Sequence, residues 1–221
     1  RALLDLARVQ VLSRQPAEAI ETLRRCLDPR KPAGHAAAAE AARMAGDLSY
    51  KRGAYDDAVA FYGRVLDRHQ NSRHFGAAVV GTLWTHYAAG RHSAVLENFD
   101  RHRTALRVQD RIPAWYLAAS AHQELGQHEA AVVLLEQISH RGGKYPLAEK
   151  VLYKLAASRF ELGQDEQMTQ AINRLREQYP GSEVLIDSEY LLAAAEARGT
   201  DVSRGAARLT KLIDQGETNP Y

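Results

Sequence analysis

The sequence has few of the residues that build cross-linked or reactive sites. Among 221 residues, only one is a cysteine, Cys26, and only two are methionines. A single cysteine excludes an internal disulfide and a cysteine-rich metal site. No segment approaches the roughly 18 to 20 consecutive apolar residues of a membrane-spanning helix. The net charge of +2 is too close to zero to indicate nucleic-acid binding.

The motifs of common enzyme classes are also missing. The sequence has no Gly-x-Ser-x-Gly elbow, phosphate-binding loop or dinucleotide glycine fingerprint. The acidic pairs Asp56-Asp57 and Asp165-Glu166 fall in the first turn of predicted helices. Carboxylates there complement the positive end of the helix dipole, so the pairs need no catalytic explanation. We therefore predict a protein that is not an enzyme, with no catalytic residue and no cofactor.

Nine histidines are the remaining candidates for metal ligands. His86 and His122 are 36 residues apart, as are His92 and His128, so each pair occupies equivalent positions in neighbouring repeats. Such positions are separated by about 10 Å, one helix-packing distance. Two nitrogens that far apart cannot both lie ~2 Å from one zinc ion. We predict packing or surface roles for these histidines and no metal site.

Regularly spaced glycines are the strongest positive feature of the sequence. Successive members of the series are 36 or 37 residues apart, and each follows a helical pattern of apolar residues: Gly53, Gly90, Gly126, Gly163 and Gly199. Glycine at that point ends a helix in a left-handed turn. A second helical pattern begins a few residues later in every case. The spacing therefore predicts an internal repeat of helical hairpins.

The repeat divides the chain into six expected hairpins and an all-α fold. The first has Arg14-Gln15-Pro16 at its turn instead of glycine, with proline at the start of its second helix. Cys26 falls on a packing face and is expected to be a buried, inert thiol. We predict one continuous domain over residues 1–221, and we expect a piece of a longer chain because the sequence opens on Arg1. The expected hairpins span residues 2–28, 36–68, 73–106, 112–140, 145–179 and 182–214.

Three of these segments resemble the tetratricopeptide repeat. That repeat has small residues where its two helices cross, glycine at the turn and proline at its end. The matching residues are Gly46, Gly53, Tyr55, Ala58 and Tyr62; then Trp115, Ala119, Gly126 and Ala131; then Leu155, Ala156, Gly163 and Pro180. The resemblance implies a right-handed superhelical α-solenoid of about six repeats that binds other proteins.

The long period and the hairpin endings resemble bacterial envelope repeat proteins of the outer-membrane assembly and Tol–Pal coordinator types. The endings in question are residues 67–72 and 176–182. This second resemblance implies a place in a bacterial multiprotein assembly. It leaves the compartment open between cytoplasm and periplasm.

The tetratricopeptide resemblance also implies which residues face the partner. In that family, particular positions of each first helix line a concave groove, and aromatic side chains there can anchor a ligand at low entropic cost. The alternative is that several of these aromatics pack between neighbouring helices. The groove positions correspond to Arg43, Asp47, Tyr50, Trp84, Tyr87, Tyr116, Ser120, Gln123 and Tyr153.

The preferred function is a non-catalytic scaffold that holds a peptide or helix of a partner protein in this groove. Two alternatives stay open. The chain can be the substrate-recruiting or regulatory region of a larger enzyme or sensor. It can also be a polysaccharide-export scaffold, because rows of aromatic side chains stack on sugars. No nucleic-acid partner and no membrane span are expected, and the sequence does not predict the oligomeric state.

Overall fold

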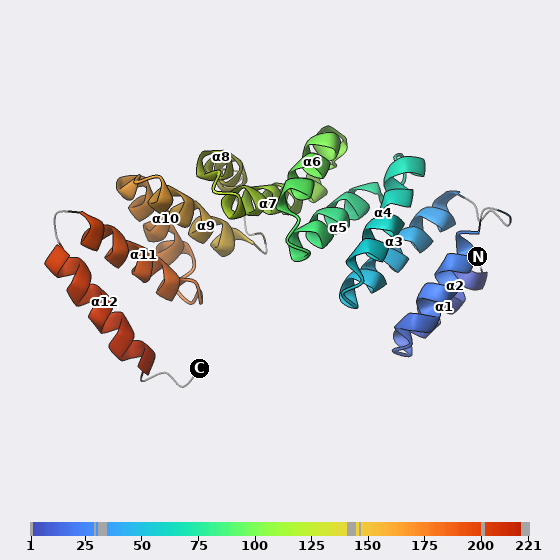
Figure 1. Cartoon of the computed structure of the whole chain (residues 1–221), viewed down its shortest axis with the longest axis horizontal. Coiled ribbons are helices and arrows are strands. Elements are labelled where there is room, and N and C mark those ends of the chain that lie inside the picture. Colours follow the sequence, from blue (N-terminus) through green and yellow to red (C-terminus); the bar gives the residue numbers. More distant parts are fainter. Residues whose placement is uncertain are drawn as a thin grey trace. The chain divides into compact units, whose positions relative to one another are not determined.

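The computed structural model describes residues 2–28, 30, 35–140, 145, 147–199 and 202–217. These residues form an all-α fold of twelve helices and one short 3-10 turn, and they contain no strand (Figure 1). The helices are α1 (Ala2–Leu12), α2 (Pro16–Cys26), α3 (His35–Lys51), α4 (Tyr55–Arg68), α5 (Phe75–Ala88), α6 (His92–His102), α7 (Val108–Glu124), α8 (His128–Ser139), α9 (Ala148–Glu161), α10 (Asp165–Gln178), α11 (Leu185–Arg198) and α12 (Val202–Glu217); the 3-10 turn η1 (Arg103–Ala105) follows α6.

The all-α prediction is confirmed, and five of the predicted hairpins are seen as contacting helix pairs: α1 with α2, α3 with α4, α5 with α6, α9 with α10, and α11 with α12. Two boundaries differ from expectation. Helix α7 begins at Val108 rather than near residue 112, because Pro113 lies inside its early turns and does not mark its start. Helix α12 continues to Glu217, beyond the predicted end at residue 214.

The turns explain the glycine period at four of its five positions. Gly53, Gly90, Gly126 and Gly163 have φ angles of 73°, 71°, 69° and 68°, the left-handed region that side chains with a Cβ rarely enter. In the first hairpin Arg14 takes this conformation with φ of 57°. Pro16 is the first residue of α2, as predicted.

Gly199 does not follow the series, and the prediction of a left-handed turn there is wrong. It caps α11 with φ of −86° and ψ of −151°, an extended conformation. Its N–H donates to the carbonyls of Ala195 and Glu196. Gly199 therefore ends α11 directly, at the position that Leu162 occupies after α9. The residue that would match Gly163 lies outside the described residues.

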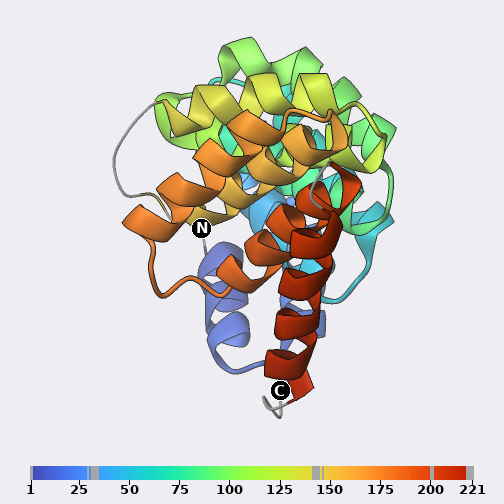
Figure 2. The same ribbon diagram turned by 90° about the vertical axis from the view of Figure 1, so that its left-hand side faces the viewer.

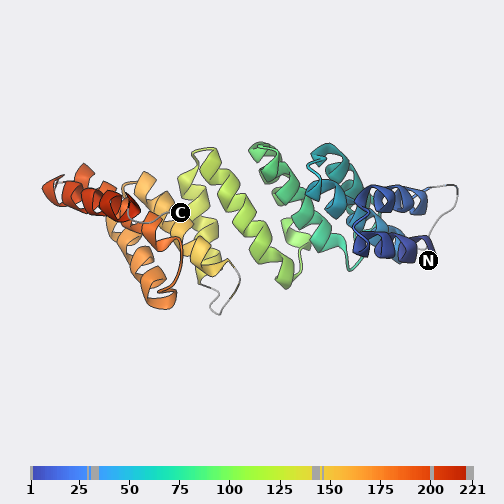
Figure 3. The same cartoon turned by 90° about the horizontal axis from the view of Figure 1, so that it is seen from below.

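Residue contacts divide the chain into two compact units, residues 1–121 and 122–221. In the first unit each hairpin packs against the next through α2 with α3 and α4 with α5, and α1 lies beside α2 (Figure 3). In the second unit α9 contacts α8, α10 and α11, while α11 packs along α12 (Figure 2). The single continuous domain stays a prediction.

The core between the first two hairpins consists of small and branched apolar side chains. Leu23 and Ala19 on α2 are fully buried against Ala41 and Ala45 on α3. Cys26 belongs to the same cluster, so the prediction of a buried thiol is confirmed. Burial raises the pKa of that thiol, which keeps it protonated and unreactive.

The ring of Tyr62 locks α4 between α3 and α5. A Cβ at Gly46 on α3 would lie 2.6 Å from Cε1 of this ring, and a Cβ at Gly81 on α5 would lie 2.5 Å from its Cζ. Both distances are too short for real atoms, so only glycine permits this approach on either side. The ring is 2% exposed. One aromatic side chain thus fixes the spacing of three helices from two hairpins.

The acidic pairs lie where the sequence predicts them, in the first turns of α4 and α10. They also reach arginines of adjacent hairpins. The Asp56 carboxylate accepts a hydrogen bond from Arg91 at 2.7 Å, and Asp165 accepts one from Arg198 at 2.8 Å. Helix-dipole and inter-repeat contacts therefore account for these carboxylates. Each exposed pair contributes at most ~1 kcal/mol.

Replacing glycine by alanine should have opposite effects on stability in a turn and inside a helix. Gly126→Ala forces a Cβ into the left-handed region and should cost about 1–2 kcal/mol. Gly63→Ala, inside α4 with nothing within 4 Å of the new Cβ, should stabilise by ~0.5–1 kcal/mol. Chemical denaturation measures both. In hydrogen exchange the Gly126 variant should lose protection mainly in α7 and α8, because repeat contacts are local; uniform loss across all helices would contradict this.

The Tyr62 contact predicts strong coupling between two positions. Gly81→Ala should cost about 1–3 kcal/mol through overpacking against the ring. In a Tyr62→Leu background the same change should cost much less, since the clashing ring atoms are gone. A double-mutant cycle by urea denaturation should give a coupling energy above ~1 kcal/mol. Additive effects would mean that the ring and Gly81 do not determine each other's position.

Candidate functional site

A cavity of about 460 Å³ opens between α3, α5 and α7 within the first unit. Three predicted groove residues, Asp47, Tyr50 and Trp84, line it together. The structure therefore brings side chains from three successive first helices to one place. The complete lining is Asp47, Tyr50, Tyr62, Ala77, Val80, Gly81, Trp84, Asp110 and Pro113.

The α3 wall of this cavity carries the Asp47 carboxylate, which has two polar partners. Asp47 accepts a hydrogen bond from the Tyr62 hydroxyl at 2.8 Å and pairs with Arg43 one turn earlier on α3. Burial, together with the Asp47 charge, raises the pKa of Tyr62 far above its usual value, so the hydroxyl remains a donor. Arg43 therefore balances the charge of Asp47. Tyr62, whose ring sets the spacing of the helices, also orients this carboxylate through its hydroxyl.

Half-buried aromatic rings form much of the remaining surface. The Trp84 indole meets Tyr87 edge to face, with ring centroids 6.4 Å apart. Tyr87 in turn meets the His92 ring at 5.2 Å. Tyr50 lies beside Tyr55 at 6.0 Å. These contacts restrict the rings on one side and leave Trp84 and Tyr50 at the cavity surface, which lowers the entropic cost of using them as anchors.

Helix α7 supplies two lining residues that the sequence analysis missed, Asp110 and Pro113. The sequence assigned Asp110 to a loop because α7 was expected to begin near residue 112. In the structure its carboxylate lies against Gly76, where any Cβ would collide with it. Burial raises the pKa of the Asp110 carboxyl, and the charge of Arg107 offsets this only in part. The sequence feature that corresponds to this contact is the glycine at position 76, because a residue with a side chain there would leave no room for the Asp110 carboxylate.

Two other predicted groove residues are buried instead of open. Tyr116 is 8% exposed and Ser120, one turn later on α7, is 1% exposed. Burial raises the pKa of the Tyr116 hydroxyl. These two side chains are therefore not open groove surface. Their burial agrees better with the alternative that they pack between helices.

The last two predicted residues lie in the second unit. The Gln123 side-chain amide donates to the Lys154 carbonyl at 2.8 Å and to the Ser158 hydroxyl at 2.7 Å, and its oxygen accepts from the Lys154 ammonium at 2.9 Å. Gln123 thus ties the end of α7 to α9. Tyr153 on α9 is half-buried, and burial together with the Asp187 charge raises its pKa.

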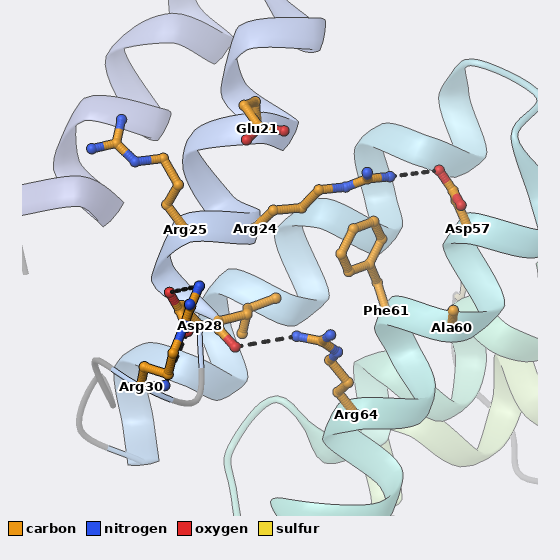
Figure 4. A pocket seen from close by; sticks show the side chains of 10 residues that line it. Glu21, Arg24, Arg25, Asp28, Arg30, Asp57, Ala60, Phe61 and Arg64 are labelled. Atoms are coloured by element: carbon orange, nitrogen blue, oxygen red, sulfur yellow. Dashed lines mark hydrogen bonds and ion pairs between the residues drawn. The ribbon is translucent and has the colours of Figure 1, made fainter.

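A second cavity, of about 510 Å³, lies between α2 and α4 (Figure 4). Four arginines line it, and two of them pair with carboxylates within the cavity. Arg24 reaches Asp57 at 2.9 Å across the face of Phe61, and Arg30 pairs with Asp28 at 3.1 Å. Figure 4 shows both contacts. The Arg24–Asp57 pair joins two hairpins, and both pairs leave this cavity less suited to a charged ligand than its arginine content suggests.

The described residues offer no arrangement typical of a metal site or a membrane span. No group of three or more His, Cys, Asp or Glu side chains in that part of the chain lies close enough to hold a metal ion. His86 is buried, and burial lowers its pKa, so its ring is neutral near pH 7. No described helix is both long enough and apolar enough to cross a membrane.

Comparison with protein families identifies two of the hairpins directly. Residues 112–138 and 150–182 each match a family model described as tetratricopeptide repeat. No curated protein sequence matches the chain significantly.

Solved structures extend the likeness to most of the chain. MamA from Desulfovibrio magneticus superimposes with a TM-score of 0.68 at 17% identity, over 83% of this chain and 97% of that one. A tetratricopeptide repeat protein from Parabacteroides merdae gives 0.71 at 15% identity, over 96% and 78%. YrrB, described as a TPR protein with an unusual peptide-binding site, gives 0.66 at 15% identity, over 88% and 92%.

The family matches and the fold agree. Proteins of this kind serve in general as non-catalytic interaction modules, and the all-helical hairpins of this chain support a protein-interaction scaffold. The chain contains tetratricopeptide repeats, and it shares the fold of tetratricopeptide-repeat proteins.

Proposed function

We propose that the chain binds a peptide or helix of a partner protein in the cavity between α3, α5 and α7, as a non-catalytic member of a multiprotein assembly. One observation carries this proposal. Asp47, Tyr50 and Trp84, which come from two different repeats, line one cavity that α7 completes. Anchors concentrate binding energy where partly desolvated aromatic side chains meet an oriented polar group.

The fixed geometry of the cavity supports the same conclusion. Tyr62, wedged between Gly46 and Gly81, holds the walls at a set spacing and positions the Asp47 carboxylate. A site that is formed before its ligand arrives loses less entropy on binding. Among the similar structures, YrrB is described as having a peptide-binding site, which agrees with a peptide ligand for this fold.

A random-peptide display selection on the full chain, followed by titration of the selected peptides, tests the proposal. Trp84→Ala should weaken binding of those peptides by ~2 kcal/mol or more, about thirtyfold, because a central aromatic anchor is lost. Its melting temperature should fall by only a few degrees, since the indole is half-buried and lines the cavity.

Tyr190→Ala is the matched control, because Tyr190 is an exposed aromatic on α11 and is not among the residues that line the cavity. It should change neither affinity nor melting temperature. The proposal is wrong if Trp84→Ala leaves peptide affinity unchanged while costing the ~3–5 kcal/mol of stability typical of a core truncation.

A further inference from the structure

The cavity between α3, α5 and α7 carries charge as well as aromatic surface. Two carboxylates line it, Asp47 on the α3 wall and Asp110 on the α7 wall, and no basic side chain is among its lining residues. The cavity therefore differs in character from a basic groove that captures a carboxylate.

The two carboxylates are not equivalent. Asp47 is satisfied by the Tyr62 hydroxyl and by Arg43. Asp110 forms no ion pair with any residue of the described ranges. The nearest basic influence on it is Arg107, which only partly offsets the effect of burial. A partly buried carboxylate without a cationic partner is costly in the free protein, and a cation from a ligand would remove that cost.

The surfaces around Asp110 suit the stem of a long basic side chain. Pro113 lies one turn further along α7, and Ala77 and Val80 on α5 add apolar surface to the same cavity that Asp110 and Trp84 line. Lysine and arginine bury their methylene stems along apolar surface while the charged group seeks a polar partner. An indole face also attracts a cation directly.

We infer that the partner segment carries a lysine or arginine whose cationic group pairs with Asp110, next to an apolar residue that contacts Trp84 and Tyr50. This inference rests on the proposed peptide-binding function and specifies the class of peptide. Asp110 selects the basic residue, whereas the aromatic pair supplies affinity that does not depend on charge.

The test uses the peptides selected on the full chain, resynthesised with Lys, Gln or Glu at the enriched position. The Lys peptide should bind about tenfold more tightly than the Gln peptide, and the Glu peptide more weakly still, as expected for a charge-assisted contact. Asp110→Asn should abolish the difference between Lys and Gln while leaving the Gln peptide's affinity unchanged. The preference should also shrink as salt concentration rises.

Asp57→Asn provides the matched control, since Asp57 lines the arginine-rich cavity of Figure 4 and pairs there with Arg24. It should keep the full lysine preference. Circular dichroism melts establish that all variants remain folded.

The possible failures are distinguishable. Selected peptides that depend on Trp84 but show no lysine or arginine preference, or a preference that survives Asp110→Asn, would overturn this inference and leave the proposed function intact. Absence of any Trp84-dependent peptide would overturn the proposed function itself and this inference with it.

Discussion

The structure of the first unit depends on one close contact, the ring of Tyr62 between Gly46 and Gly81. Because neither glycine can carry a side chain without displacing the ring, the distances from α4 to α3 and to α5 are fixed by a single residue. The same residue reaches the wall of the cavity between α3, α5 and α7 through its hydroxyl, which orients Asp47. One side chain thus links the packing of the core to the shape of the cavity, and the cavity walls cannot shift without disturbing the core.

Most of the architecture follows from the sequence because its signals are local. The period of turn glycines and the small residues at helix crossings predict six hairpins, and the helices lie where they were expected apart from the earlier start of α7 and the later end of α12. The spacing of glycines locates the turns but does not fix their conformation. Arg14 adopts the left-handed geometry without being glycine, whereas Gly199 is extended. Local hydrogen bonding at each helix end decides between these outcomes.

The site was predictable only in part, because helical periodicity identifies a face but not what covers it. Trp84 and Tyr50 line the cavity, while Tyr116 and Ser120, at comparable positions on α7, are buried. Side-chain size and helix spacing make that difference, and neither can be obtained from one repeat alone. Asp110 was missed for another reason: α7 begins at Val108, four residues before the expected start of the fourth hairpin at residue 112, which brings this carboxylate onto the helix.

The central claim is that the cavity between α3, α5 and α7 is the place where a partner segment binds. The most direct measurement is an NMR titration of the isotopically labelled full chain with a selected peptide, followed through backbone amides and the Trp84 indole N–H. The account predicts shift changes concentrated at the three walls, around Asp47, Trp84 and Asp110. Changes concentrated instead around Arg24 and Arg64, in the cavity between α2 and α4, or confined to the second unit, would contradict it.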